Sequence, residues 1–167
     1  MFGRNKKESL FLKLVEQNKG VIYALCKSYH SIDADRQDSF QEIIAQLWIA
    51  FPSFRSESKF STWMYKIALH TLLNQKRKKR IQTGPLDQAI HISIDAPSKE
   101  KDTKEVIEIL FDQLEDLDRG ILILYLEGYA NKEIAKILDM PYTNVTTRMY
   151  RIKQSLSKKV KNGLIQF

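Results

Sequence analysis

Residues 131–160 constrain the local fold of this 167-residue chain more than any other segment. Residues 131–138 and 142–160 both show helical spacing, and the tight break Asp139-Met140-Pro141 separates them. In the second segment apolar side chains recur at steps of three and four residues. These apolar positions are Val145, Met149, Ile152, Leu156 and Val160. The pattern predicts two short helices joined by a turn, with one side of the second helix buried.

The other face of the second helix carries small polar side chains and arginines. Its members are Thr143, Asn144, Thr146, Thr147, Arg148 and Arg151. A helix that buries one side and presents such residues on the other suits the major groove of duplex DNA. The segment is therefore interpreted as a helix-turn-helix.

The first half of the chain predicts three further helices, at about residues 8–29, 34–51 and 59–80, which would form one compact bundle. Ser31 or Asp33 is expected to cap the second helix, and Pro52 to end it. Cys26 falls on an apolar face and is expected to be buried as a small hydrophobic residue. As the single cysteine, it excludes an internal disulfide and a cysteine-based zinc site.

Residues 81–103 lack helical periodicity and include Gly84, Pro85 and Pro97. We interpret them as a flexible linker, because so long an irregular loop is unusual inside a compact domain. Further helices are expected from residue 104 and from Asp118, with Gly128 closing the latter. The sequence thus predicts an all-α fold in which a three-helix domain (1–80) and a four-helix domain (104–167) are joined by that linker.

Charge is distributed unevenly along the chain. The net charge is +7, and residues 59–80 and 140–167 contain lysines and arginines but no acidic residue. Two basic blocks on separate helices favour a nucleic-acid partner. The acidic run at 100–118 is expected to be a solvated face. A hydrophobic content of 43% with 28% charged residues indicates a folded, soluble protein. No signal peptide or apolar run of membrane-spanning length is evident, so a cytoplasmic location is expected.

Several motifs match one family. DSFQEIIAQLW at 38–48, FPSFR at 51–55 and KFSTWMYKIA at 59–68 resemble region 2 of bacterial sigma factors, in particular the small extracytoplasmic-function (ECF) type. LEDLDR at 114–119, YLEG at 125–128, KEIA at 132–135 and VTTRMYR at 145–151 resemble region 4. The region 2 block is the more specific, because many regulators share the helix-turn-helix.

The resemblance implies partners for both domains. Region 2 would bind the clamp helices of the largest subunit of core RNA polymerase and open the promoter −10 element. Region 4 would read the −35 element as duplex and contact the polymerase flap, and an anti-sigma factor would be a further partner. Asp38, Gln41 and Glu42 lie off the apolar stripe of their helix, and they are the predicted polymerase-binding residues.

The resemblance also implies two sets of DNA-binding residues, one for each promoter element. The loop at 55–58, backed by Phe60, resembles the element that captures a flipped base, and the next helix would follow the backbone phosphates. The predicted −10 residues are Arg55, Ser56, Glu57, Ser58, Lys59, Lys66, His70, Asn74 and Arg77. The predicted −35 residues are Thr143, Asn144, Thr146, Thr147, Arg148, Arg151 and Lys153.

The chain departs from the family pattern at several positions. Lys66 and Ile67 stand where housekeeping sigma factors have a strand-separating aromatic pair, as expected of the ECF type. His70 and Asn74 replace a common asparagine and aspartate, which alters the base preference to be expected. Asp139 replaces the usual turn glycine, and the turn should survive because aspartate tolerates a left-handed conformation.

No catalytic constellation, phosphate-binding loop or metal-ligand set is apparent in the sequence, so neither an enzyme nor a cofactor is expected. The alternative is a dimeric helix-turn-helix regulator that binds operator duplex without polymerase, with residues 1–80 as a sensing or oligomerisation module. A nucleic-acid-processing enzyme would need residues that the sequence does not offer. A regulator of this kind would retard DNA alone, whereas a sigma factor would need core polymerase.

Overall fold

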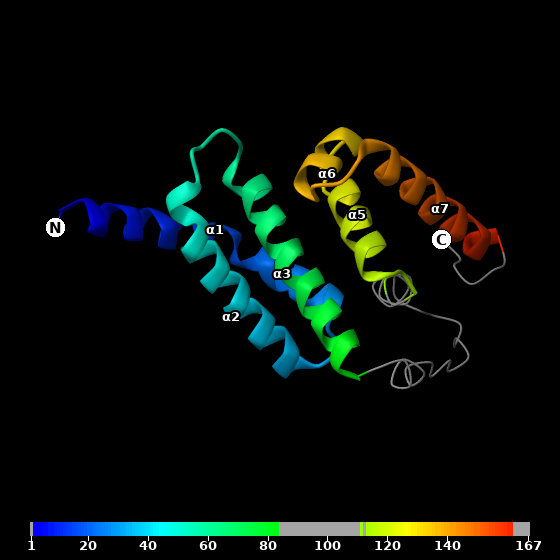
Figure 1. Ribbon diagram of the computed structural model, residues 1–167, viewed down its shortest axis with the longest axis horizontal. Helices are drawn as coiled ribbons and strands as arrows, with labels where there is room; N and C mark the ends of the chain where they lie inside the picture. Colours follow the sequence, from blue (N-terminus) through cyan, green and yellow to red (C-terminus); the bar gives the residue numbers. More distant parts are fainter. Residues whose placement is uncertain (1, 84–110, 112, 162–167) are drawn as a thin grey trace. The chain divides into compact units, whose positions relative to one another are not determined.

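The computed structural model describes residues 2–83, 111 and 113–161, and these contain helices but no strand (Figure 1). The elements are α1 (Phe2–Tyr29), α2 (Asp33–Ala50), the 3-10 turn η1 (Phe51–Ser53), α3 (Phe60–Thr83), α5 (Asp116–Leu126), α6 (Asn131–Ile137) and α7 (Tyr142–Lys161). The all-α prediction is confirmed. The chain divides into two compact units, Met1–Gln75 and Lys76–Phe167.

Helix boundaries differ from the sequence prediction at several places. α1 begins at Phe2 rather than near residue 8, and α3 continues to Thr83, three residues into the expected linker. The N-cap of α2 is Ile32, so the prediction that Ser31 or Asp33 caps this helix is wrong. Asp33 and Asp35 lie instead in its first turn, where carboxylates interact favourably with the helix dipole. The rest of the linker and the helix expected from residue 104 lie outside the described residues.

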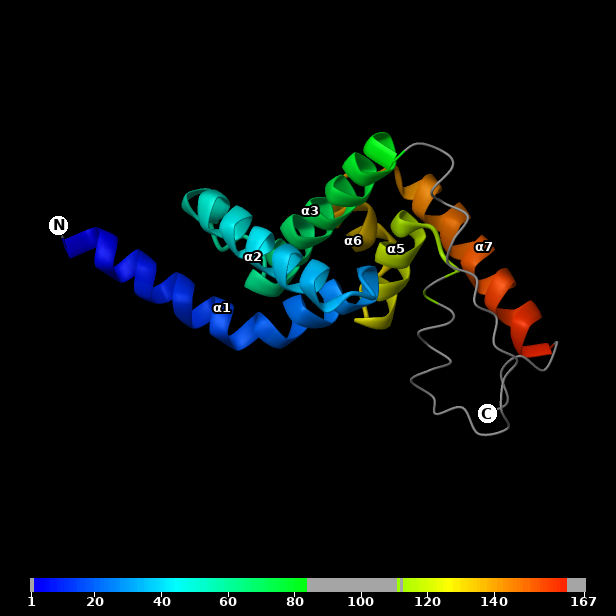
Figure 2. The ribbon, with the colours of Figure 1, turned by 90° about the horizontal axis from the view of Figure 1, so that it is seen from below.

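The first unit packs α1, α2 and α3 around an apolar core (Figures 1 and 2). Ile22, Ile43 and Leu72, one from each helix, are fully buried in it. Cys26 is also fully buried, as predicted, and burial raises the pKa of its thiol to about 11. The uncharged thiol therefore behaves as one more small apolar group of the core.

A polar network joins the same three helices. Ser39, buried on α2, donates a hydrogen bond to Oε1 of Gln75 on α3 at 2.8 Å. Its Oγ lies 2.9 Å from Nε2 of His30, which directly follows α1. Because the single hydroxyl proton of Ser39 goes to Gln75, Nε2 of His30 donates to Ser39. These bonds satisfy polar groups at the end of the core where the three helices meet.

In the second unit, α7 lies against α5 and α6. Val145, Met149 and Ile152 of α7 are buried, as are Leu124 of α5 and Ile134 of α6, which confirms three positions of the predicted apolar stripe. Leu156 is half-buried, and the side chain of Val160 lies outside the described residues. The part of the chain that the structure describes contains no helix both long and apolar enough to cross a membrane.

Residues in a left-handed conformation end α5 and α6. Gly128 has φ 90°, and the N–H of Tyr129 donates to the carbonyl oxygen of Leu124. Asp139 has φ 52°, and the N–H of Met140 donates to the carbonyl oxygen of Ala135. Both are Schellman endings, which glycine adopts without strain and aspartate tolerates. The expectation that Asp139 preserves the turn of the helix-turn-helix is confirmed.

The N-terminus of α6 is only half capped, which leads to a stability prediction. The carboxylate of Glu133 accepts the N–H of Ala130 at 2.8 Å, but Ala130 has no side-chain acceptor to offer in return. Ala130→Ser would supply that acceptor and complete a capping box. We expect the free energy of unfolding of the second unit to rise by about 0.5–1 kcal/mol. Urea denaturation followed by circular dichroism measures it.

The control for this prediction removes the reciprocal hydrogen bond. In the Ala130→Ser background, Glu133→Ala should cancel part of the gain, since the box then loses its other half. A serine variant no more stable than the parent would contradict the capping assignment.

Candidate polymerase and nucleic-acid interfaces

The exposed face of α2 carries the three predicted polymerase-binding residues. Asp38, Gln41 and Glu42 are exposed, while Ser39, Ile43 and Leu47 are buried on the opposite side. Nε2 of Gln46 donates to the Glu42 carboxylate at 2.8 Å and orients it along the helix. The structure thus brings the three side chains onto one polar, acidic surface.

Two apolar residues extend this surface: Ala45, which the helical spacing placed on it, and Ile49, which the sequence did not identify. Ala45 is exposed on the same face, and Ile49 is 69% exposed one turn further on. The position of Ile49 opposite the buried stripe was the available signal, because a large apolar side chain on that face has no place in the core. An apolar end beside an acidic strip is typical of a surface that binds another protein.

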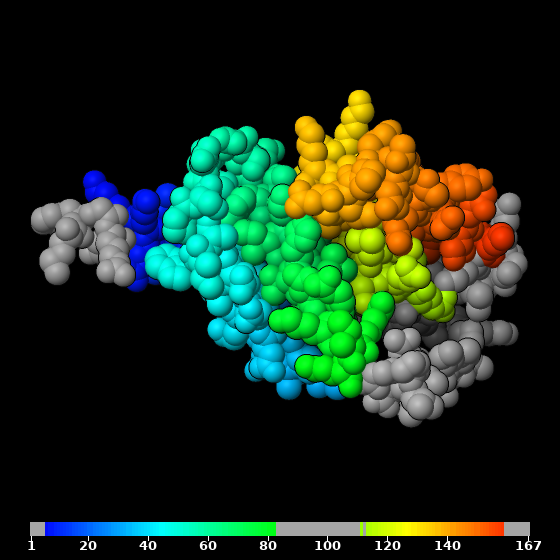
Figure 3. Space-filling view, viewed as in Figure 1, coloured from blue at the N-terminus to red at the C-terminus, as the bar shows by residue number. Residues whose placement is uncertain are grey.

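The loop between η1 and α3 contains the residues predicted to capture a base. Residues 55–59 are all exposed, and Figure 3 draws this segment in teal as an arch at the top of the first unit. Aromatic packing holds both ends of the loop. Phe54, before it, lies 5.7 Å from Phe60, after it, and 5.0 Å from Trp63 between ring centroids.

The aromatic cluster limits the conformations that the loop can adopt. Phe60 is buried, so it supports the loop from behind. Ser56 has φ 58°, a left-handed conformation that costs a serine about 1 kcal/mol or more. The loop is therefore a short exposed polar segment of restricted shape, anchored at both ends.

Four of the predicted −10 residues lie on one side of α3, the helix that follows this loop. Lys66, His70, Asn74 and Arg77 follow one another at steps of four, four and three residues, which places them on the same side of the helix. Lys66 and His70 are half-buried, whereas Asn74 and Arg77 are exposed or nearly so along the rest of the helix. The solvent exposure of these side chains therefore increases with distance from the loop.

The outward face of α7 presents four of the residues predicted to read the −35 duplex. Thr143, Asn144, Thr147 and Arg151 are all exposed. Oγ1 of Thr147 donates to the carbonyl oxygen of Thr143 at 2.9 Å, which fixes its hydroxyl and leaves its lone pairs outward as acceptors.

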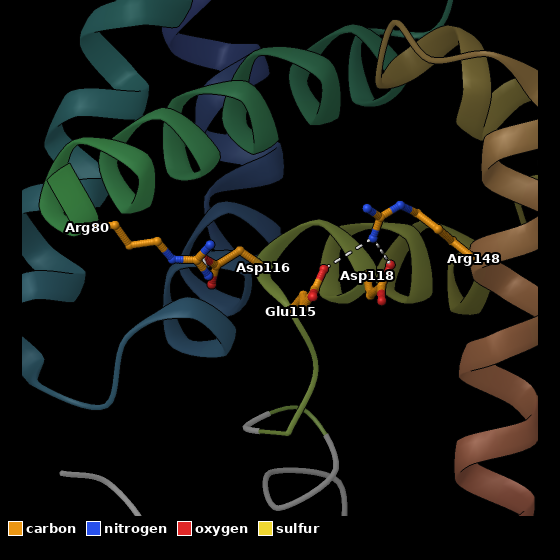
Figure 4. A network of polar contacts seen from close by, with 5 residues as sticks. All are labelled: Arg80, Glu115, Asp116, Asp118 and Arg148. Atoms are coloured by element: carbon orange, nitrogen blue, oxygen red, sulfur yellow. Dashed lines mark hydrogen bonds and ion pairs between the residues drawn. The ribbon is translucent and has the colours of Figure 1, made fainter. Parts of the chain in front are cut away.

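Thr146 and Arg148, also predicted to read the duplex, are half-buried. The hydroxyl of Thr146 donates to the backbone carbonyls of Tyr142 and Thr143. Nη1 of Arg148 donates to Asp118 of α5 at 2.6 Å and to Glu115, before that helix, at 3.4 Å (Figure 4). The hydrogen bond to Asp118 raises the pKa of Arg148 above its usual value, although partial burial opposes the shift.

This ion pair also corrects the interpretation of the acidic run. Residues 100–118 were expected to form a solvated face, yet Asp118 is mostly shielded, with 19% of its side chain exposed. At least the end of the run contributes carboxylates to an internal contact with α7. Sequence spacing offered no signal for a pair separated by 30 residues.

On the other flank of α7, Nζ of Lys153 lies 4.3 Å from the ring centroid of Tyr125 and donates to its hydroxyl at 3.0 Å. Tyr150, which is 63% exposed, and Gln154 add outward-facing groups that the sequence analysis missed. Nε2 of Gln154 donates to the Tyr150 hydroxyl at 2.6 Å. Both residues lie opposite the apolar stripe, so helical spacing alone could have identified them.

The described residues contain no group of three or more His, Cys, Asp or Glu side chains that could hold a metal ion.

Comparison with known proteins assigns both parts of the chain. Residues 14–81 match the family model for Sigma-70 region 2, and residues 105–156 match that for Sigma-70, region 4. The ECF RNA polymerase sigma-E factor of Haemophilus influenzae is 30% identical over 165 residues, covering 90% of this chain and 87% of that protein. The ECF RNA polymerase sigma factor SigW of Bacillus subtilis is 26% identical over 170 residues, covering 93% and 91%.

Solved structures show the same fold. The sigma factor RpoE from Bartonella quintana, in complex with the anti-sigma factor NepR, aligns with a TM-score of 0.69 at 19% identity, covering 95% of this chain and 98% of that chain. CnrH, in complex with the cytosolic domain of CnrY, aligns with a TM-score of 0.65 at 18% identity, covering 93% and 90%. The two family models together match more than half of the chain, which therefore belongs to the sigma-70 family as an ECF sigma factor, a class that directs RNA polymerase to specific promoters.

Proposed function

We propose that this chain binds core RNA polymerase through the exposed face of α2, opens the −10 element with the loop at 55–58 and α3, and reads the −35 element with α7. Residues 1–80 form the first functional domain and residues 104–167 the second, with 81–103 as the linker. The chain catalyses no reaction itself, and the polymerase core performs the chemistry. Such a protein acts where the polymerase is, in the cytoplasm.

The observation that carries this proposal is the anchored loop before α3. An exposed polar segment held by aromatic packing at both ends, followed by a helix with a basic end, suits a splayed-out base and its phosphates. A dimeric regulator that reads only duplex has no use for a base-capturing loop. The acidic and apolar face of α2 further supports a polymerase contact over a purely nucleic-acid role.

At the −35 element, Thr143, Asn144, Thr147 and Arg151 would approach base edges. Lys153 would lie nearer phosphate, at the rim of the same surface. The outward position of Tyr150 adds an aromatic contact to this set.

An anti-sigma factor is the further partner we propose. The solved complex of RpoE with the anti-sigma factor NepR supports this proposal, because RpoE has the same fold. The exposed apolar and acidic face of α2 and the outward face of α7 are the surfaces whose occlusion would silence the proposed activity.

Reconstitution with core polymerase tests the function. Core polymerase plus this chain should form a complex that initiates from a subset of a promoter library, while the chain alone should retard none of the library at the same concentration. Retardation of duplex by the chain alone, with no effect on core polymerase, would establish the regulator instead.

The loop at 55–58 yields a specific prediction. Exchange of this loop for that of a related sigma factor should switch the preferred −10 sequence and leave −35 preference and core affinity unchanged. The reason is that Lys66 and Ile67 provide no aromatic wedge, so base capture must offset an unstacking cost of a few kcal/mol. Transcription of a −10 library on linear duplex and on pre-opened templates measures the switch. If the parental preference persists on both templates, the loop is only a connector.

A further inference from the structure

Polar contacts on both flanks of α7 accompany its apolar seam. The seam is formed by Val145, Met149 and Ile152. With about 3.6 residues per turn, Arg148 lies on one side of this seam and Lys153 on the other. Arg148 binds Asp118 near the start of α5, and Lys153 binds Tyr125 near its end. Contacts on both sides of an apolar seam resist rotation of the helix about its own axis.

We propose that Arg148 is a positioning residue whose ion pair with Asp118 fixes the rotation of α7, and that it contacts neither a base nor a phosphate. The inference rests on the proposed function, in which α7 reads duplex DNA. The structure departs here from the direct base contact that the sequence predicts for Arg148.

The Arg148–Asp118 pair is suited to holding geometry. Only 27% of the Arg148 side chain and 19% of the Asp118 side chain are exposed, so water screens the contact weakly. Asp118 lies in the first turn of α5, where the helix dipole already favours a carboxylate. A charge-assisted bond of 2.6 Å would have to break before this guanidinium could reach DNA.

Small rotations of α7 have large consequences at its outward face. Outward side chains end about 6 Å from the helix axis, so a rotation of about 20° displaces them by about 2 Å. Hydrogen bonds to base edges do not tolerate such a displacement. Loss of the pair should therefore disturb all of the reading residues together, rather than the contact with any one base.

A different role for Asp118 and Glu115 would predict the opposite change in DNA affinity. If Asp118 and Glu115 merely masked an arginine able to bind phosphate, Asp118→Asn would release that arginine. It would also remove a negative charge near the DNA. Affinity would then rise and its salt dependence would steepen. If Arg148 only positions α7, Asp118→Asn lowers affinity although it makes the chain more positive.

The test uses the reconstituted holoenzyme and a library of −35 variants, at several salt concentrations and at a temperature where circular dichroism shows every variant folded. Arg148→Ala and Asp118→Asn should each lower affinity about three- to tenfold for all −35 sequences alike, with an unchanged salt slope. The double variant should bind no more weakly than the weaker single variant, because both changes remove one contact. Arg148→Lys keeps the charge and should retain most of the affinity.

Arg151→Ala is the matched control, since it removes an arginine from the same helix but should alter base preference. Altered preference in Arg148→Ala would make Arg148 a base reader, and a shallower salt slope would make it a phosphate contact; either result overturns the proposal. Tighter binding by Asp118→Asn, or lower melting temperatures with unchanged affinity, would overturn it as well. If the parent holoenzyme shows no −35 preference at all, the proposed function fails before any variant is compared.

Discussion

Glu42→Lys is expected to weaken binding to core polymerase by about 1–3 kcal/mol, or up to about a hundredfold in the dissociation constant. Glu42 lies at the centre of the exposed face of α2, between Asp38 and Ala45. A lysine there would oppose the cationic groups that an acidic surface attracts. Within the chain, the substitution removes the exposed hydrogen bond that Gln46 donates to Glu42, and helical content should not change. Titration of labelled core polymerase measures the affinity.

Glu16→Lys is the control for the change in net charge. Glu16 is exposed on α1 rather than on α2, and it pairs with nearby Lys19. The control should bind core polymerase as the parent does. Equal losses in both variants would indicate a general charge effect, and an unaltered Glu42→Lys would remove α2 from the interface.

Arg151→Ala should change base preference at one or two −35 positions, with a loss of about 1–3 kcal/mol at the preferred base. Arg151 is exposed on the outward face of α7, and it forms no ion pair within the described part of the chain. Its guanidinium is thus available for a bidentate contact with guanine. Binding of the holoenzyme to a −35 library measures the preference position by position.

Lys153→Ala provides the comparison. A contact with phosphate carries no sequence information, so its removal should weaken binding to all sequences alike and reduce the salt slope by about one. If Arg151→Ala gave this uniform pattern instead, Arg151 would be a phosphate contact and the reading face of α7 would need to be redrawn.

Helical periodicity predicted most of the fold, because each amphipathic stripe has a local cause. The burial of Ile43 and Leu47 on α2, of Val145, Met149 and Ile152 on α7, and of Cys26 follows from spacing within one helix. Trp48, which the same spacing assigns to the α2 stripe, is 46% exposed. Helix starts were harder to predict. α1 begins at Phe2 although its first turn carries no acidic residue, and α2 begins after Ile32, which has no capping side chain. Capping and dipole preferences are weak, so a helix can begin without either signal.

The exposure of the candidate site residues was predicted where spacing on one helix decides it, and not where a distant partner decides it. Asp38, Gln41 and Glu42 are exposed because they lie opposite a buried stripe on one helix. Arg148 is drawn away from the outward face by a carboxylate 30 residues earlier, and no local pattern encodes that pair. Helical periodicity therefore does not predict ion pairs between residues that are far apart in the sequence.

The positive φ angles of three exposed residues limit which substitutions those positions tolerate. Ser56, Gly128 and Asp139 all have positive φ and all lie at the surface, where most substitutions are neutral. Backbone geometry rather than side-chain packing restricts them to glycine, asparagine, aspartate and similar small residues. A mutational tolerance map of this protein would thus show intolerant sites at the loop at 55–58 and at the ends of α5 and α6, where solvent exposure alone would predict tolerance.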